Sequence, residues 1–410
     1  METDPRTALP ADIAPVSAKT RKMNEFRAGT IFPFKTWQSL PSFSTAVLNI
    51  SLSAGTLLVG AGGLVLTVVV FLPVGILKSV GGRVGARIQK APKPAKSADA
   101  KRRCIVITGA RTPSSGIGAA LALEYAAPDA HLILIARDET RLKDVAAQAS
   151  QRGATASVHS IDLSELDGVA ELDNLLEKAD AQADGIDIAI SCAGITSHHT
   201  GVLDRKGMHD SPRDDVSQPP PPDGIPGQGD DAWGVDTASQ MLQVNVAANQ
   251  AFVLRSWELM KARQLRGSRP ATARPGPKII VLSSSTAFFL PATFALYAAS
   301  KAYLYTLARS LQIASVPYGI GVVAVTPGFV ETGMTATVRA AGARLPAAVL
   351  GDPRTLARKI RRSGEENELL VFYPTFQVWS LFVLRGLNPL LETFGMWAAA
   401  SMGVAAWFFS

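Results

Sequence analysis

Tyr297 and Lys301 are the two residues whose types and spacing most clearly suggest chemistry. They lie in the segment YAASK, four positions apart in a predicted helix, so their side chains share one face of that helix. A free tyrosine has a pKa of about 10, but a neighbouring ammonium favours the phenolate and lowers that pKa toward neutrality. The pair therefore suggests an acid–base tyrosine, with two solvated side chains at helical spacing as the alternative.

Two further segments carry side chains or backbone groups that suit this chemistry. Ser284 ends the predicted strand KIIVLSS, thirteen positions before Tyr297, where a strand end and a helix start can meet at the rim of a sheet. The glycine-rich segment TGARTPSSGIG, at 108–118, follows the first predicted strand and opens the next helix. Such glycines let a pyrophosphate approach the N–H groups of a helix N-terminus. The context indicates a dinucleotide site, with a plain strand-to-helix turn as the alternative.

Strands and helices alternate in the part of the chain that positions these residues. Six short apolar runs are predicted strands, at 104–108, 131–136, 156–161, 186–191, 278–282 and 320–325. The predicted helices lie at 117–127, 140–151, 163–178, 237–262 and 294–314. Asp352 and Pro353 begin a further basic helix, which Gly364 is predicted to end, and 369–373 is a last strand. This alternation predicts an α/β fold with a doubly wound parallel sheet buried on both faces.

The 410-residue chain also has apolar and basic segments outside this domain. Residues 54–77 are uncharged and long enough to cross a bilayer core of about 30 Å as a helix, with a buried core helix as the alternative. Between Lys78 and Arg103 stand nine basic residues and one acid, so the rest of a chain whose net charge is +7 sums to −1. The basic cluster predicts that the downstream domain lies in the cytosol and that the cluster is attracted to anionic lipid. The nearly neutral remainder gives no support for nucleic-acid binding.

We therefore expect five parts along the chain: an N-terminal tail at 1–53, a transmembrane helix at 54–77, a basic linker at 78–103, the α/β domain at 104–375 and an apolar C-terminus at 376–410. The Pro-rich insertion at 197–236 is interpreted as disordered, with a lid as the alternative. The C-terminus is interrupted by charges and is expected to lie on the membrane, with a second span or a packed core as alternatives. The two cysteines and five histidines form neither a disulfide framework nor metal-ligand spacing, so we expect no metal site.

These motifs, taken in order, resemble the short-chain dehydrogenase/reductase family over about residues 103–375. The resemblance rests on the glycine segment, CAG at 192–194, Ser284 with the YAASK pair, and PGFVET at 327–332. It implies a Rossmann-type sheet. Together with the apolar segment at 54–77 and the basic linker, it predicts a single-pass, membrane-anchored member of the family, at the endoplasmic reticulum or a similar membrane. It also implies homodimers or homotetramers.

The resemblance implies a role for each residue of the catalytic set. Tyr297 is implied to protonate a ketone oxygen, or to act as the base in the reverse direction. Lys301 is implied to hold the nicotinamide ribose and to lower the tyrosine pKa, while Ser284 hydrogen-bonds the substrate carbonyl. Asn245, in LQVNVAAN, is implied to anchor a water relay behind Lys301, with a helix asparagine facing solvent as the alternative.

The resemblance also implies a nicotinamide cofactor. Arg137 follows the second strand, where an acid binds the ribose 2′-hydroxyl of NAD(H) and an arginine suits the 2′-phosphate of NADP(H). Asp138 beside it keeps NAD(H) as the alternative. Asp162 is implied to contact the adenine and Thr332 the nicotinamide carboxamide. The residues implied to line the cofactor site are Gly109, Arg111, Ser115, Gly116, Ile117, Gly118, Arg137, Asp162, Leu163, Cys192, Ala193, Gly194, Tyr297, Lys301, Pro327, Gly328, Val330 and Thr332.

Two departures from the family pattern bear on function. Six residues separate Gly109 from Gly116, where the family has three; related enoyl reductases lengthen this turn, but they space tyrosine and lysine more widely. Cys192 replaces the usual asparagine, which weakens the expected side-chain bond to the neighbouring strand. We expect an NADP(H)-dependent interconversion of a hydrophobic ketone and a secondary alcohol, such as a 3-ketosphinganine, a 3-oxoacyl thioester, a steroid or a retinoid. A nucleotide-binding scaffold without turnover, and an enoyl reductase, are the alternatives.

Overall fold

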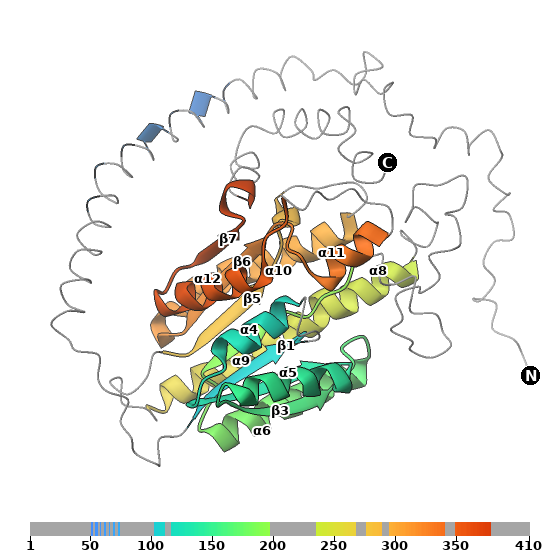
Figure 1. Ribbon diagram of the computed structural model, residues 1–410. Coiled ribbons are helices and arrows are strands. Elements are labelled where there is room, and N and C mark those ends of the chain that lie inside the picture. Colours follow the sequence, from blue (N-terminus) through green and yellow to red (C-terminus); the bar gives the residue numbers. More distant parts are fainter. Residues whose placement is uncertain are drawn as a thin grey trace, which may run out of the picture.

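Seven parallel strands form one sheet in the computed structural model, with helices on both of its faces (Figure 1). The structure describes residues 102–110, 116–196, 235–267, 276–288, 295–340 and 349–378, with isolated positions between 51 and 73. The strands are β1 (Arg103–Thr108), β2 (Ala130–Ala136), β3 (Thr155–Ser160), β4 (Ile188–Ser191), β5 (Lys278–Leu282), β6 (Gly321–Pro327) and β7 (Leu370–Tyr373). Their order across the sheet is β3-β2-β1-β4-β5-β6-β7, and each neighbouring pair is parallel. The predicted doubly wound parallel sheet is confirmed.

Helices cover the sheet in two layers. One layer contains α4 (Ile117–Tyr125), α5 (Glu139–Gln151) and α12 (Pro353–Glu365). The other contains α6 (Leu166–Ala183), α9 (Asn249–Leu265) and α10 (Ala295–Ala314). The shorter elements are α8 (Val235–Leu242), the π-helix η4 (Gln243–Ala248), the 3₁₀ turns η5 (Ser285–Ala287) and η7 (Val316–Tyr318), and α11 (Gly333–Ala340).

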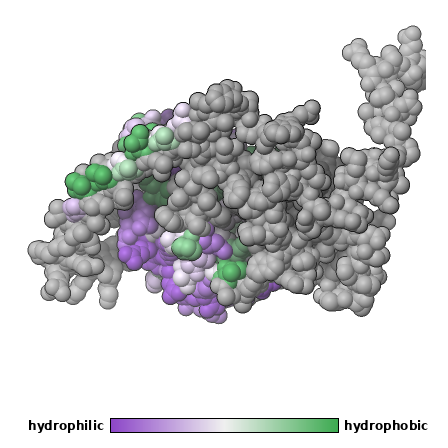
Figure 2. All heavy atoms as spheres, turned by 90° about the horizontal axis from the view of Figure 1, so that it is seen from above, coloured by the Kyte–Doolittle hydropathy of each residue, from purple (hydrophilic) through white to green (hydrophobic). Residues whose placement is uncertain are grey.

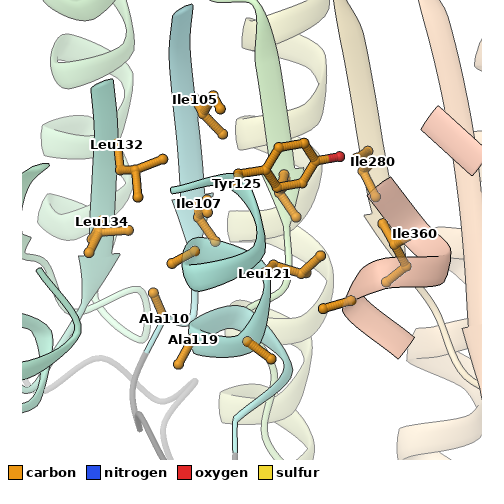
Figure 3. Close-up of a cluster of buried hydrophobic side chains, with 14 of the residues drawn as sticks. Ile105, Ile107, Ala110, Ala119, Leu121, Tyr125, Leu132, Leu134, Ile280 and Ile360 are labelled. Atoms are coloured by element: carbon orange, nitrogen blue, oxygen red, sulfur yellow. The ribbon is translucent and has the colours of Figure 1, made fainter. Parts of the chain in front are cut away.

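The central strands are apolar on both faces because both faces are covered. Along β1, Ile105 and Ile107 point into the core between the sheet and the layer of α4, α5 and α12, where Ile360 of α12 joins them (Figure 3). Cys104 and Val106, which alternate with them, point into the opposite core. Where its described surface is visible in Figure 2, the molecule is mostly hydrophilic, with hydrophobic residues at scattered positions.

Two predicted helix boundaries are wrong for local reasons. The single helix predicted at 237–262 is three consecutive elements, α8, η4 and α9, because the chain passes through a π-helical turn at 243–248. Gly364 does not end α12, which runs to Glu365; it is buried within the helix. The residue in the left-handed conformation after the helix is Asn367, with φ of 57°. Asparagine tolerates this conformation and ends the helix in the place expected of glycine.

The described residues leave the predictions about the chain ends open. Five predicted parts lie largely outside them: the tail at 1–53, the transmembrane helix at 54–77, the basic linker at 78–103, the insertion at 197–236 and the C-terminus at 376–410. Within the described residues, no helix combines the length and the hydropathy that crossing a membrane requires. The anchor, the lid and the lipid contact therefore stay predictions.

Candidate active site

The predicted catalytic and cofactor residues gather where β1, β4 and β5 end. Gly109 follows β1, Cys192 and Gly194 follow β4, and Ser284 follows β5. The strand order reverses between β1 and β4: the strands before this point progress toward β3, and the later ones toward β7. Such a switch point leaves a crevice outside the carboxyl ends of the strands, where open α/β sheets bind ligands.

Tyr297, Lys301 and Ser284 lie close together at this edge of the sheet, as their spacing in the sequence predicts. Tyr297 is in the first turn of α10, and the Lys301 Nζ lies 5.7 Å from the centre of the tyrosine ring. The Ser284 side chain hydrogen-bonds the Tyr297 side chain. Lys301 is buried, and its Nζ donates to the backbone carbonyl oxygen of Leu282 at 3.2 Å. A hydroxyl, a phenol and an ammonium therefore share one small volume.

Burial, rather than the neighbouring charge, controls the ionisation of Tyr297. It raises the pKa of the phenol to about 12, against a smaller lowering by the hydrogen bond with Ser284. Burial also lowers the pKa of Lys301 to about 8. The predicted net lowering of the tyrosine pKa toward neutrality is therefore wrong for this arrangement, because desolvation favours the neutral form of each group. At neutral pH the phenol keeps its proton beside a charged lysine, which suits a proton donor.

Asn245 holds the chain after β4 in place. It is fully buried in η4, so the alternative of a solvent-facing asparagine is wrong. Its Oδ1 accepts from the Ile195 backbone N–H at 2.8 Å, and its Nδ2 donates to the Ile195 carbonyl oxygen at 2.9 Å and to Ser300 Oγ at 3.1 Å. A Cβ on Gly194 would lie 3.2 Å from Lys301 Nζ and 3.4 Å from Asn245 Oδ1. The asparagine thus ties this segment to α10 directly beside Lys301.

Two residues outside the predicted set support the turn that contains Cys192. Thr108 Oγ1 accepts from the backbone N–H of Cys192 at 3.0 Å and of Ala193 at 3.2 Å. Asn249 Nδ2 donates to the Ala193 carbonyl oxygen at 3.1 Å. The turn is therefore joined to β1 through backbone groups, which do not depend on the side chain at position 192. Burial raises the pKa of the Cys192 thiol to about 12, so the thiol is neutral.

The glycine segment packs too closely for side chains. Gly109 has φ of 73°, and a Cβ there would lie 2.9 Å from the backbone nitrogen of Ala193. A Cβ on Gly118 would lie 2.5 Å from the carbonyl oxygen of Gly109. Gly116 precedes α4, whose first turn contains no acidic residue, so the field of this helix N-terminus favours an anion. This cradle fits a dinucleotide pyrophosphate; two predicted members of it lie outside the described residues, Arg111 and Ser115.

The ends of β2 and β3 carry the residues predicted for the adenosine half of the cofactor. Arg137 Nη1 lies 4.0 Å from Asp162 Oδ2, and Leu163 next to Asp162 is buried. The Asp138 carboxylate accepts from the Arg141 backbone N–H at 3.0 Å and pairs with the Arg141 side chain at 3.0 Å. Asp138 therefore serves as the N-cap of α5, and its charge is balanced by Arg141.

The loop at 327–332, which follows β6, lies at the same edge of the sheet. The Gly328 N–H donates to the carbonyl oxygen of Tyr373 at 2.7 Å. Val330 pairs with Gly351 through an isolated parallel bridge, and Thr332 precedes α11. The loop is thus fixed by β7 and by the chain that enters α12. All the predicted site residues that the structure describes lie at the carboxyl-end edge of the sheet or on the helices that begin there.

The chain matches the model of the family described as short chain dehydrogenase at residues 103–211 and 235–343, which together make up more than half of its length. The interruption falls within the Pro-rich insertion. The match begins at β1 and ends shortly after α11. It therefore contains every residue of the catalytic set.

Curated relatives share parts of this domain. The chain is 37% identical over 94 residues to a fatty acyl-CoA reductase from Acinetobacter baylyi, a match that covers 23% of this chain and 30% of that protein. It is 26% identical over 238 residues to an uncharacterized oxidoreductase from Staphylococcus epidermidis, covering 58% and 82%. It is 28% identical over 241 residues to 11-beta-hydroxysteroid dehydrogenase A from Sesamum indicum, covering 58% and 56%.

Solved structures superpose on this chain at low sequence identity. A short-chain dehydrogenase from Sphingobium yanoikuyae in complex with NADPH superposes with a TM-score of 0.48 at 21% identity, covering 74% of this chain and 95% of that one. A bulky-bulky ketone specific alcohol dehydrogenase from Comamonas testosteroni gives a TM-score of 0.48 at 20% identity, covering 75% and 94%.

We expect Asn245→Ala to destabilise the domain by about 2–4 kcal/mol, because it leaves the buried N–H and carbonyl of Ile195 without their side-chain partner. Urea unfolding of the detergent-solubilised chain measures this change. Asn174→Ala, at an exposed position on α6, is the control and should change stability by less than about 0.5 kcal/mol. Equal effects of the two substitutions would contradict the role given to Asn245.

Proposed function

Since the chain belongs to the short-chain dehydrogenase family, we propose that it is an NADP(H)-dependent oxidoreductase that interconverts a hydrophobic ketone and a secondary alcohol. One observation carries this proposal: Ser284, Tyr297 and Lys301 lie together beside the glycine cradle at the switch point of the sheet. A cradle for a dinucleotide and a proton donor within one crevice provide the two components that carbonyl reduction requires.

Each residue of the catalytic set has a separate role in the proposed reaction. The nicotinamide cofactor, when bound, supplies or accepts the hydride. The Ser284 hydroxyl hydrogen-bonds the substrate oxygen and keeps it next to the phenol of Tyr297, which transfers its proton to that oxygen. The Lys301 ammonium stabilises the phenolate that forms when this proton leaves. During this proton transfer, Asn245 holds the segment after β4 next to the start of α10 through its hydrogen bonds to Ile195 and Ser300.

The described surroundings of Tyr297 favour an apolar substrate. Ile195, Met241 and Val244 form a buried cluster against which Leu296 and Tyr297 pack. A wall of this kind gains free energy by covering apolar rather than polar ligand surface. Two of the relatives are named for a fatty acyl-CoA and for a hydroxysteroid, which agrees with a lipid-like ketone such as a 3-ketosphinganine, a 3-oxoacyl or a steroid-like compound.

Arg137 supports NADP(H) over NAD(H). Discrimination between the two depends on the ribose 2′ position, where a carboxylate binds a hydroxyl and an arginine binds a phosphate. The carboxylate at this place belongs to Asp138, which caps α5 and pairs with Arg141. Arg137 takes no part in that cap, and its ion pair with Asp162 is long, at 4.0 Å. A bound 2′-phosphate can therefore recruit Arg137 with little loss of existing contacts.

A membrane location agrees with the sequence on either side of the domain. The apolar segment at 54–77 precedes a basic linker, a combination that favours a single span with the catalytic domain in the cytosol. Leu58, Val65 and Val69, which are described within that segment, are exposed by 75%, 61% and 66%. Exposed apolar side chains of this kind suit contact with lipid rather than with a protein core. A membrane anchor would bring the site close to substrates dissolved in the bilayer.

Reduction of hydrophobic ketones by the detergent-solubilised full chain tests the proposed reaction. NADPH oxidation should accompany formation of the alcohol, and Tyr297→Phe should lower the rate by about 100-fold or more while NADPH still binds. Tyr303→Phe, an exposed tyrosine on the same helix, is the matched control and should retain full activity. Binding of NADPH without turnover of any ketone would favour a scaffold, and saturation of a C=C bond would favour an enoyl reductase.

The pH dependence should reveal the titration of Lys301. Its pKa is lowered to about 8, so the ammonium is present below that pH and is lost as the pH rises through it. The ketone-reduction rate at saturating substrate should therefore be level at neutral pH and should fall above a pH of about 8. Lys301→Arg, if active, should move this fall to higher pH, because the guanidinium keeps its proton. A rate that is constant between pH of about 7 and 10 would contradict a need for the ammonium.

Arg137→Gln should separate the two cofactors. Loss of a charge-assisted bond to the 2′-phosphate should raise the KM for NADPH by about tenfold or more and leave the KM for NADH nearly unchanged. Steady-state kinetics with both cofactors measures the split. Arg152→Gln, at the opposite end of α5, serves as the control. An equal rise in both KM values would show that Arg137 acts on the fold and not on the phosphate.

A further inference from the structure

The chain immediately after β7 touches two parts of the active site at once. It forms a short helical turn at 375–378, visible beyond the end of β7 in Figure 1. Its residue Gln377 contacts the loop at 327–332. Its residue Val378 is fully buried in a cluster with Ala287 and Phe288, which belong to the turn that follows Ser284.

Gln377 is fitted closely to the loop that follows β6. Its side-chain Oε1 accepts from the Phe329 backbone N–H at 3.3 Å. Position 328 is a glycine, and a Cβ there would overlap the side-chain amide of Gln377. The absence of a side chain at Gly328 is thus what allows Gln377 to reach the backbone of the loop. The same loop is bound from β7 by the bond between the Gly328 N–H and the Tyr373 carbonyl.

The turn at 375–378 is itself held from other directions, so it can serve as a fixed support. Lys359 Nζ of α12 donates to the Phe372 carbonyl oxygen and to Thr375 Oγ1, each at 2.8 Å. On the other side, the Phe288 ring packs edge-on against the rings of Tyr305 and Phe372 at 4.9 and 6.2 Å between centroids. Gln377 therefore projects toward the loop from a segment anchored to α12, β7 and α10.

We propose that Gln377 is a positioning residue for the cofactor: it fixes the loop at 327–332 in the conformation that receives the nicotinamide half of the dinucleotide. This inference rests on the proposed function and on the role that the family resemblance implies for the loop at 327–332, which is to line the cofactor site. Gln377 does not touch the reacting atoms, so it acts on cofactor binding and not on the proton transfer at Tyr297. Because 376–410 is the apolar C-terminus, Gln377 also gives that segment a direct physical connection to the cofactor loop.

The test measures NADPH binding to the full chain in detergent by the change in nicotinamide fluorescence. Gln377→Ala should weaken NADPH binding by about three- to tenfold, the range expected for one lost hydrogen bond and its packing. The rate at saturating NADPH and ketone should stay within about twofold of the parent, since Tyr297 and Ser284 are untouched. Gln377→Glu keeps an acceptor oxygen at the same reach and should restore most of the affinity. Gln377→Met keeps the volume without the acceptor and should behave like Gln377→Ala.

A double-substitution cycle with Gly328→Ala separates positioning from a general loss of structure. Gly328→Ala alone should weaken NADPH binding, because the new methyl group displaces Gln377 from Phe329. In the Gln377→Ala background the same methyl group has nothing to displace and should have a smaller effect. Equal effects in both backgrounds, or unchanged NADPH binding in Gln377→Ala and Gln377→Met, would overturn the inference while leaving the proposed function intact. A parent chain that binds neither NADPH nor NADH would overturn both.

Discussion

The active site depends on keeping one ammonium group, that of Lys301, out of water. Removing this charge from solvent is unfavourable, and the fall of its pKa to about 8 expresses that penalty. The penalty is partly offset at the end of β5, where Nζ donates to the Leu282 carbonyl oxygen. In the other direction, Ser283 Oγ donates to the Lys301 backbone carbonyl oxygen at 2.6 Å. These two bonds run in opposite directions between α10 and the end of β5, so placing the charge also docks the helix. Tyr297, one turn earlier on α10, is brought to Ser284 by the same docking.

The parallel sheet supplies the rest of the geometry. Since all seven strands point the same way, their carboxyl ends share one edge, and residues more than 100 positions apart in the sequence, such as Gly194 and Lys301, become neighbours there. The turn after β4 packs against two other parts of the site, the glycine segment on one side and Lys301 on the other. Two buried side-chain amides hold the turn in this position. Asn245 hydrogen-bonds the backbone of Ile195, and Asn249 hydrogen-bonds the backbone of Ala193. Their backbone partners would otherwise be buried without hydrogen bonds.

The sequence predicted the arrangement of the domain better than its ionisation. Apolar runs located the strands because buried parallel strands are apolar on both faces, and the order of motifs located Ser284, Tyr297, Lys301 and Asn245. Spacing alone could not show how much water surrounds Tyr297, so the direction of its pKa shift was wrong. One helix end was misplaced because Asn367 takes the place expected of glycine, and one predicted helix is divided by a π-helical turn. Thr108, Asn249 and Gln377 act through backbone groups of distant segments, and short polar residues in such positions have no distinctive pattern. Only Asn249 could have been found from the sequence, because it lies four residues after Asn245 and therefore on the same face of the predicted helix.

The burial that favours the neutral forms of Tyr297 and Lys301 would also make the pair effective in the proposed reaction of an apolar ketone. In a site of low polarity, the charge on Lys301 acts more strongly on negative charge that develops nearby than it would in water. In the proposed reaction, the phenolate of Tyr297 would form on a ring whose centre lies 5.7 Å from that ammonium. The ammonium would thus act on the charge that develops on the phenol oxygen and little on the neutral phenol, so that it would stabilise the transition state rather than the ground state. An apolar wall of Ile195, Met241 and Val244 keeps the polarity of this site low. A hydrophobic substrate that fills the space beside it would exclude further water and strengthen the same effect.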